Sequence, residues 1–171
     1  MSRRITIAAA AAVHRETIEQ VAVVVELQDP AVWAVPRQPG KWSPSEIAQH
    51  LVISYEPALA ELDGGAGFAL ALPWWKRTVL RWTVLPRILD GRFPKGAPAP
   101  KQARPRGGAA SPREAARALR ENAARFERRL VEAHAAGPVR LTHAYFGRLT
   151  APQILKLLAV HATHHRSQFP S

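Results

Sequence analysis

The sequence predicts an all-α fold, an antiparallel four-helix bundle with a long crossover connection between its second and third helices. The main observation is a capping box of the form Ser/Thr-x-x-Glu/Gln, which opens three of the four helical stretches, at Ser43, Ser111 and Thr150. The second connection is long and the others are short, which permits a crossover. We expect one domain over residues 1–171, with a Trp/Arg-rich and Pro/Gly-rich connection at about 66–110.

The first helix is predicted over about residues 7–27. Ile18, Val21, Ala22 and Val25 form an apolar stripe at helical spacing, and the pair Asp29-Pro30 follows it. An alternative is a short signal peptide, since Ser2-Arg3-Arg4 precedes an apolar run. That run is dominated by alanine and continues into HRETIEQ without a break, so we prefer the helix.

The second helix has the clearest start signal in the chain. Ser43 is the predicted N-cap, a proline occupies the first helical position and Glu46 completes the capping box. Pro57 falls inside the helical pattern and should kink or shorten the helix. The inward-facing stripe is predicted to be Ile47, His50, Leu51 and Ser54.

The connection begins with a segment at 68–89 in which tryptophans alternate with basic residues, namely Trp74, Trp75, Trp82, Lys76, Arg77, Arg81 and Arg87. One interpretation is an amphipathic segment on a membrane surface. We prefer a short helix or hairpin that caps the bundle, because flanking prolines limit a helix to about three turns. Residues 94–108, rich in Pro, Gly, Lys and Arg, are predicted to be a solvated, poorly ordered connection.

The third helix is predicted to start at Ser111 and to end at Gly137-Pro138, with one face of alanine, leucine and phenylalanine directed inward. A short connector, VRLTHAYFGR, follows. The fourth helix is predicted over 149–168, with Thr150 as its N-cap and Gln153 closing the capping box.

The amino-acid composition excludes several classes of functional site. The chain has no cysteine, which excludes a disulfide framework, a zinc-thiolate cluster and a cysteine nucleophile. It carries 24 Lys+Arg against 13 Asp+Glu. The basic stretch at 95–129 suggests nucleic-acid binding, but the connection at 94–108 lacks the aromatic residues that stack on single strands, so we expect no nucleic-acid partner.

The sequence contains no run of about 18 uncharged apolar residues, so we predict no transmembrane helix. We expect a cytoplasmic protein.

Three histidines fall on inward-facing stripes: His50 on the second helix, and His161 and His165 on the fourth. The spacing i, i+4 places two imidazoles one turn apart, so that one metal ion can bridge them. Three imidazole ligands leave a position open for water or substrate, which is typical of catalytic metal sites. The alternative is that these histidines are structural and hydrogen-bonded to the backbone or to one another.

Other residues near this cluster are weaker candidates. His164 competes with His165 as a ligand, because it lies at i+3 from His161. Gln168 could orient a ligand imidazole, and Tyr55 is a candidate cavity residue. We assign no role to His14, His134 and His143.

Two segments together resemble the DinB superfamily, which includes YfiT-like metal-dependent hydrolases and bacillithiol- and mycothiol-dependent transferases. They are KWSPSEIAQHL and YFGRLTAPQILKLLAVHATHHRSQF. The resemblance covers about residues 42–62 and 145–168. It implies a four-helix bundle with crossover topology and a divalent metal held by three histidines, which correspond to His50, His161 and His165 here. In the thiol-transferase branch such a metal binds a low-molecular-weight thiol as its thiolate.

These observations lead to a ranked set of functions. First is a metal-dependent transferase or hydrolase in which the metal activates a small thiol or water toward a small electrophile. Zinc or nickel is the expected metal, with iron as a further candidate. Second is a non-catalytic small-molecule or stress-response binding protein on the same bundle. Third is a membrane- or nucleic-acid-associated basic protein. A homodimer through Trp74 and Trp75 is a candidate assembly.

Overall fold

The computed structural model describes residues 6–94 and 96–170. The described residues are mostly helical, with one small two-stranded sheet. In chain order the elements are α1 (Ile7–Glu26), α2 (Pro44–Ile53), α3 (Glu56–Leu62), α4 (Trp74–Thr83), α5 (Leu85–Leu89), the 3-10 turn η1 (Lys101–Ala103), α6 (Pro112–Ala136), β1 (Arg140–His143), β2 (Gly147–Thr150) and α7 (Ala151–Arg166).

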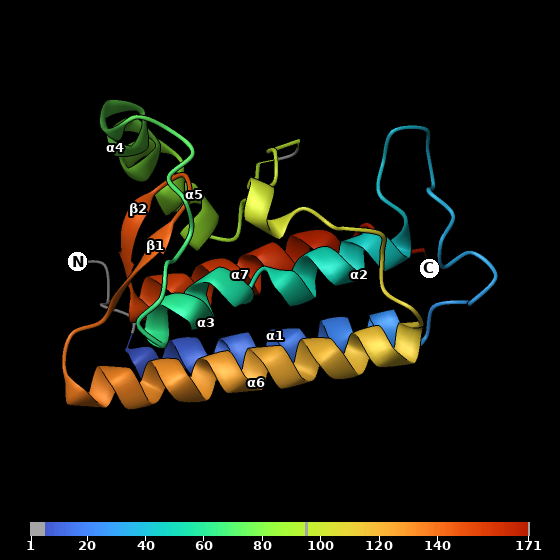
Figure 1. The fold of residues 1–171 in the computed structure, drawn as a ribbon, viewed down its shortest axis with the longest axis horizontal. Helices are drawn as coiled ribbons and strands as arrows, with labels where there is room; N and C mark the ends of the chain where they lie inside the picture. The colour runs from blue at the N-terminus through green and yellow to red at the C-terminus, as the bar shows by residue number, and fades with distance from the viewer. Residues whose placement is uncertain (1–5, 95, 171) are drawn as a thin grey trace.

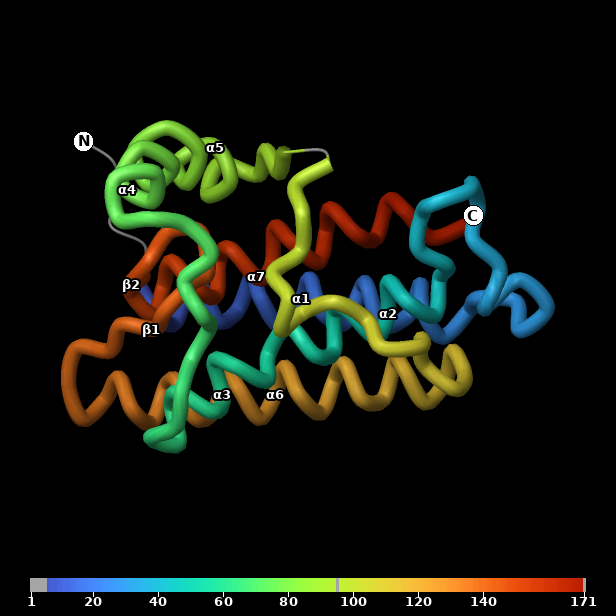
Figure 2. The backbone as a smooth tube through the Cα atoms, turned by 45° about the horizontal axis from the view of Figure 1, so that its top comes forward, coloured from blue at the N-terminus to red at the C-terminus, as the bar shows by residue number. Residues whose placement is uncertain are grey.

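The body of the molecule consists of four long helical segments. They are α1, α6, α7 and the consecutive helices α2 and α3, which together form one segment (Figure 1). In Figure 1, α1 and α7 run in one direction, whereas the α2–α3 segment and α6 run in the other. Because α3 and α6 run the same way, the chain between them returns along the bundle. This returning segment, with α4, α5 and η1, lies on the side of the bundle opposite α1 and α6 (Figure 2).

The first helix, α1, packs against both α6 and α7. Its N-cap is Thr6, whose side chain accepts a hydrogen bond from the backbone of Ala9. The predicted stripe is confirmed, since Ile18, Val21 and Val25 are buried. Ser2, Arg3 and Arg4, on which the signal-peptide interpretation rests, lie outside the described residues.

The break between α2 and α3 follows from Pro57. The proline has no backbone N–H, and its ring clashes with the carbonyl four residues earlier, so a continuous helix is excluded. The chain turns at Ser54 and Tyr55 and restarts at Glu56. At the other end of α2 the capping box forms as predicted: the backbone N–H of Ser43 donates to Glu46, and that of Glu46 donates to the Ser43 hydroxyl.

The all-α prediction is wrong in one element. The connector before α7 is an antiparallel hairpin in which Leu141 pairs with Leu149 and His143 with Gly147. Both leucines are buried, so the strands are held by packing against the core. Gly147 has φ 68°, a conformation that glycine adopts without steric cost, which allows the turn.

The segment at 68–89 forms two short helices, but its tryptophans do not cap the bundle. In α5, Leu85 and Ile88 are buried and the helix packs against α7. No residue of α4 is buried, and Trp74 and Trp82 are 72% and 77% exposed. The preferred interpretation is therefore right for α5 and wrong for the exposed face of α4.

The part of the connection predicted to be poorly ordered is fixed to the bundle by side chains. The Trp33 indole donates to the carbonyl of Ala109 (2.9 Å), and the Tyr145 hydroxyl donates to that of Pro98 (2.9 Å). The Gln49 amide donates to the carbonyl of Gly108 and accepts from its N–H. These bonds hold residues 96–110 over the face formed by α2 and α7.

None of the helices in the described ranges is both long and apolar enough to cross a bilayer.

Candidate metal centre

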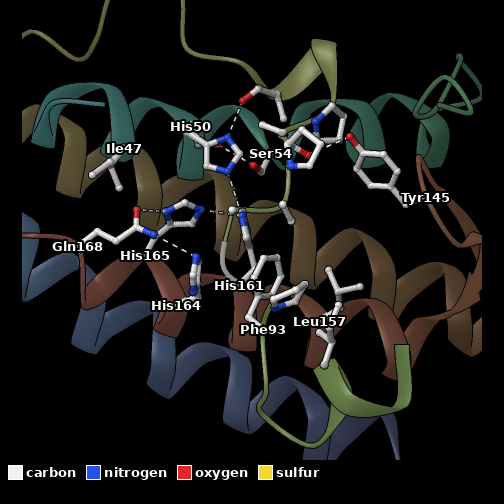
Figure 3. Close-up of a pocket in the computed structure, with 18 of the residues that line it drawn as sticks. Ile47, His50, Ser54, Phe93, Tyr145, Leu157, His161, His164, His165 and Gln168 are labelled. Carbon is white, nitrogen blue, oxygen red and sulfur yellow. Dashed lines mark hydrogen bonds between the residues drawn. The ribbon is translucent and has the colours of Figure 1, made fainter. Parts of the chain in front are cut away.

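Three imidazoles from two helices meet beneath the connection (Figure 3). His50 comes from α2, and His161 and His165 come from successive turns of α7. The Nε2 atom of His161 lies 2.9 Å from Nε2 of His50 and 3.1 Å from Nε2 of His165. The structure thus brings together the three histidines that the helical stripes and the resemblance both selected.

The outer nitrogens of two of these rings are bound to oxygen acceptors. Nδ1 of His50 donates to the backbone carbonyl of Ala103, which a turn of the connection places above the ring. Nδ1 of His165 donates to the side-chain oxygen of Gln168 (2.9 Å). A neutral imidazole carries one proton, so Nε2 of His50 and Nε2 of His165 each present a lone pair.

The three Nε2 atoms therefore cannot satisfy one another by hydrogen bonding. With two rings fixed as acceptors, only His161 can supply a proton, and one N–H cannot fully serve two acceptors. At least one nitrogen in the cluster lacks a hydrogen, in a place where an unpaired polar atom costs about 1–3 kcal/mol. A cation would satisfy all three Nε2 atoms at once, because a neutral His161 can also present a lone pair at Nε2 when its proton lies on Nδ1.

Burial keeps these rings neutral. It is the main cause that lowers the pKa of His161 far below its ordinary value, and the neighbouring imidazoles, His165 first, lower it further. Burial also lowers the pKa of His165 to about 3 and lowers that of His50, in the latter case against the opposing hydrogen bond to Ala103. The cluster is thus in the unprotonated form that metal binding requires.

The separations of the nitrogens suit a small divalent ion. Zinc–nitrogen bonds of about 2.0–2.1 Å in tetrahedral geometry put ligand nitrogens about 3.3 Å apart. Two of the three observed separations, 2.9 and 3.1 Å, differ from that by a few tenths of an ångström, and all three ligand nitrogens lie within 4.8 Å of one another. The residues present fit a metal held by three imidazoles.

The structure places the weaker candidates around this cluster. Nε2 of His164 accepts from the Gln168 amide nitrogen (3.0 Å), and its ring stacks on Phe93. Gln168 therefore bridges His164 and His165, because its oxygen accepts from the latter. The indole of Trp42 stacks against His165 and tilts over His50, which closes one side of the cluster.

Tyr55 lies in the bundle core and not among the residues that line the cavity. Its hydroxyl donates to Nε2 of His14 (2.9 Å), and Nδ1 of His14 faces Glu127 (3.5 Å). Glu127 also pairs with Arg15. His14, to which the sequence assigned nothing, is thus 1% exposed in a polar network of its own.

A cavity of about 980 Å³ opens beside the cluster. Its walls come from α2, α7, the short helices and the connection. They are mainly apolar and aromatic, and they include Ile47, Leu72, Leu80, Val84, Ile88, Phe93, Leu157 and Leu158. Among the described residues that line it, none is Asp or Glu. The cavity is large enough for a small organic substrate.

His143 is a further polar residue that lines this cavity, and the sequence analysis assigned it no role. It ends β1, and its Nδ1 accepts a hydrogen bond from the backbone N–H of Tyr145 (3.2 Å). The proton of the neutral ring therefore lies on Nε2, and burial lowers the pKa of this histidine to about 4. The only sequence signal for this site was Gly147, which marks the turn of the hairpin.

Comparison with known proteins supports the fold. The structure of YfiT from Bacillus subtilis, described as a probable metal-dependent hydrolase with an unusual four-helix bundle topology, matches with a TM-score of 0.57 at 15% identity. The match covers 99% of this chain and 88% of that one. No curated protein sequence matches significantly. A family model matches residues 14–171, so the chain belongs to the family described as protein of unknown function, DUF1569.

Proposed function

We propose that this protein is a metal-dependent enzyme that joins a small thiol, or water, to a small electrophile. The observation that carries the proposal is the convergence of three Nε2 atoms that cannot satisfy one another. His50, His161 and His165 would hold the ion. When bound, a divalent metal lowers the pKa of a coordinated thiol or water and so supplies a nucleophile near neutral pH.

The remaining residues of the site have separate tasks. The carbonyl of Ala103 and the amide of Gln168 fix the orientation of two ligand rings and increase their basicity. Apolar side chains such as Phe93 and Leu157 keep bulk water from the cavity. His143 presents an N–H donor to the cavity, suited to a carbonyl oxygen or another electronegative atom of the electrophile.

Membership of the DinB superfamily forms part of the proposal. The two motif segments of the sequence support it, and so does the YfiT-like fold. The expected metals are zinc and nickel, followed by iron, because imidazole nitrogens suit all three. The lack of a carboxylate among the lining residues favours a metal-bound thiolate, which needs no separate base, over water.

The test uses the purified protein loaded with zinc or nickel. We would measure consumption of small electrophiles, such as epoxides and α,β-unsaturated carbonyl compounds, with and without a low-molecular-weight thiol. Activity that requires metal, and that is absent in a folded His161→Ala variant, supports the proposal. No turnover in any metal-loaded form, together with saturable ligand binding, would support the alternative below.

The second candidate is a binding protein without catalysis. The same absence of carboxylates favours it, since a hydrolase usually positions a general base near the attacking water. In this case the cavity would bind an apolar small molecule, and the metal, if bound, would add one polar contact. Ligand affinity measured beside turnover separates the two functions.

A further inference from the structure

Helix α4 exposes an apolar face that the proposed catalytic function does not use. The face consists of Trp74, Trp75, Val79 and Trp82, which are 72%, 52%, 54% and 77% exposed. At 100° per residue these positions fall within one side of the helix. In Figure 1, α4 lies at the outer edge of the molecule, away from the long helices. Three exposed tryptophans on ten residues are far from the usual surface composition.

The orientation of α4 is fixed by Arg81 and Leu80. The Arg81 guanidinium donates to the carbonyl of Arg148 (2.6 Å) and to that of Phe146 (3.3 Å), both in the hairpin. Leu80, on the same inner side, packs against the core. A helix free to rotate would turn its tryptophans inward and its arginines outward, whereas these contacts hold the reverse orientation.

The surroundings of this face are strongly basic. Residues 66–110 carry nine Lys and Arg and a single Asp, a net charge of +8 against +11 for the whole chain. Lys76 lies over the ring of Trp75, at 5.2 Å from its centroid. Arg87 in α5 and Arg92, which follows α5, are exposed, and Figure 2 shows α4, α5 and the connection on the same side of the bundle.

We propose that this side of the protein docks on an anionic lipid surface, with the tryptophans of α4 inserted at the level of the lipid headgroups. Indole rings prefer this interface, and basic side chains around them attract acidic lipids. A second copy of the chain is the weaker occupant, because it would bring two surfaces of the same charge together. The docking is independent of the metal centre. Leu80 lines the cavity from the inner side of α4, so the cavity would lie directly above the lipid surface.

The test measures binding of the full chain to vesicles. Vesicles of phosphatidylcholine mixed with phosphatidylglycerol are compared with vesicles of phosphatidylcholine alone, by co-sedimentation and by tryptophan emission. We expect binding to the anionic vesicles with a blue shift of the emission, weakened by added salt. The double variant Trp74→Ser, Trp82→Ser should bind at least about tenfold more weakly. Leu27→Ser, at a similarly exposed apolar position (78%) that caps the C-terminal end of α1, should bind like the wild type.

Three results would overturn the proposal. The first is no binding of the folded wild type to anionic vesicles. The second is unchanged binding by the double tryptophan variant, whose fold is checked by circular dichroism and by the emission of the remaining Trp33, Trp42 and Trp75. The third is a dimer in solution that the double variant abolishes, without vesicle binding by the wild type, which would assign the face to a second copy of this chain.

Discussion

Two groups of buried histidine occupy the same bundle, and their hydrogen bonds differ in kind. His14 on α1 accepts from the Tyr55 hydroxyl at one nitrogen and faces the Glu127 carboxylate with the other (2.9 and 3.5 Å). Each nitrogen meets a group of complementary type. In the cluster of His50, His161 and His165, nitrogen faces nitrogen in both short contacts, and Nε2 of His50 and Nε2 of His165 are fixed as lone pairs.

The difference shows how a structural histidine can be distinguished from a metal ligand without a bound ion. Burial is common to both groups, since His14 is 1% exposed and His50 is 3% exposed. The complementarity of the partners is what separates them. A satisfied imidazole has one donor and one acceptor around it, whereas a ligand set presents lone pairs to an empty point. His143 is intermediate, with one satisfied nitrogen and one N–H directed to the cavity.

The largest expected effect is the loss of metal from the cluster when one ligand is removed. His161→Ala should lower metal affinity by well over about a hundredfold, since even partners of ligands contribute about 10–100-fold. A chelator should then lower the Tm of the wild type but not that of the variant. His164→Ala is the matched control, because Nε2 of His164 faces Gln168 and not the other three rings. An equal chelator effect in His161→Ala and the wild type would remove His161 from the site.

The next effect concerns His14 and should leave metal binding intact. His14→Leu removes the partner of the Tyr55 hydroxyl and of one oxygen of Glu127. We therefore expect the free energy of unfolding to fall by about 1–3 kcal/mol. This corresponds to a fall of about 2–4 °C in Tm per kcal/mol for a chain of this size. Tyr55→Phe should lower the free energy of unfolding less in the His14→Leu variant than in the wild type, because its hydrogen-bond partner is already absent. A double-mutant cycle measures this difference. Loss of metal in His14→Leu would show that the two groups are coupled.

A smaller effect is expected at Gln168. Gln168→Leu removes the oxygen that accepts from Nδ1 of His165, and the freed ring should bind metal about 10–100-fold more weakly. Competition with a chelator of known affinity measures the change. Ser167→Ala, the exposed neighbouring position, serves as the control. Unchanged affinity in Gln168→Leu would mean that packing alone orients His165.

The smallest effect is a pH dependence of the His14 network. Hydrogen bonding to His14 first, and then to Arg15, holds the pKa of Glu127 below its ordinary value of 4.5, against the opposing effect of burial. A depressed carboxyl pKa stabilises the fold above the unfolded value, and this contribution is lost as the pH falls below 4.5 through the lowered pKa. The Tm difference between the wild type and Glu127→Gln should therefore be largest near neutral pH and shrink in acid. A difference that does not change with pH would contradict this account of Glu127.

Much of the helical framework was readable from the sequence, because capping and periodicity are local. The helix predicted over 7–27 runs over Ile7–Glu26, and the Ser43 box forms where it was expected. The hairpin was missed because its strands of four residues are too short to show an alternation, and packing of Leu141 and Leu149 holds them in place.

The outer face of α4 also escaped prediction, for a tertiary reason. Its tryptophans lie on one side of the helix and its basic residues on the other, and the sequence alone does not decide which side faces the bundle. The carbonyls of Phe146 and Arg148 decide the orientation, and they belong to the hairpin that was itself missed.

The candidate site, like the fold, could be predicted from the sequence only in part. His50, His161 and His165 lie on stripes that the sequence shows. The partner of His50 is the carbonyl of Ala103, in a segment whose path depends on Trp33, Gln49 and Tyr145, and no local pattern reveals it.

The most direct test of the central claim is the metal content of three purified proteins, measured by elemental analysis after growth with zinc and nickel: the wild type, His161→Ala and His14→Leu. We predict one equivalent of zinc or nickel in the wild type and in His14→Leu, and none in His161→Ala. If all three proteins contain no metal after reconstitution, or if His161→Ala retains a full equivalent, the cluster of His50, His161 and His165 is not a metal centre.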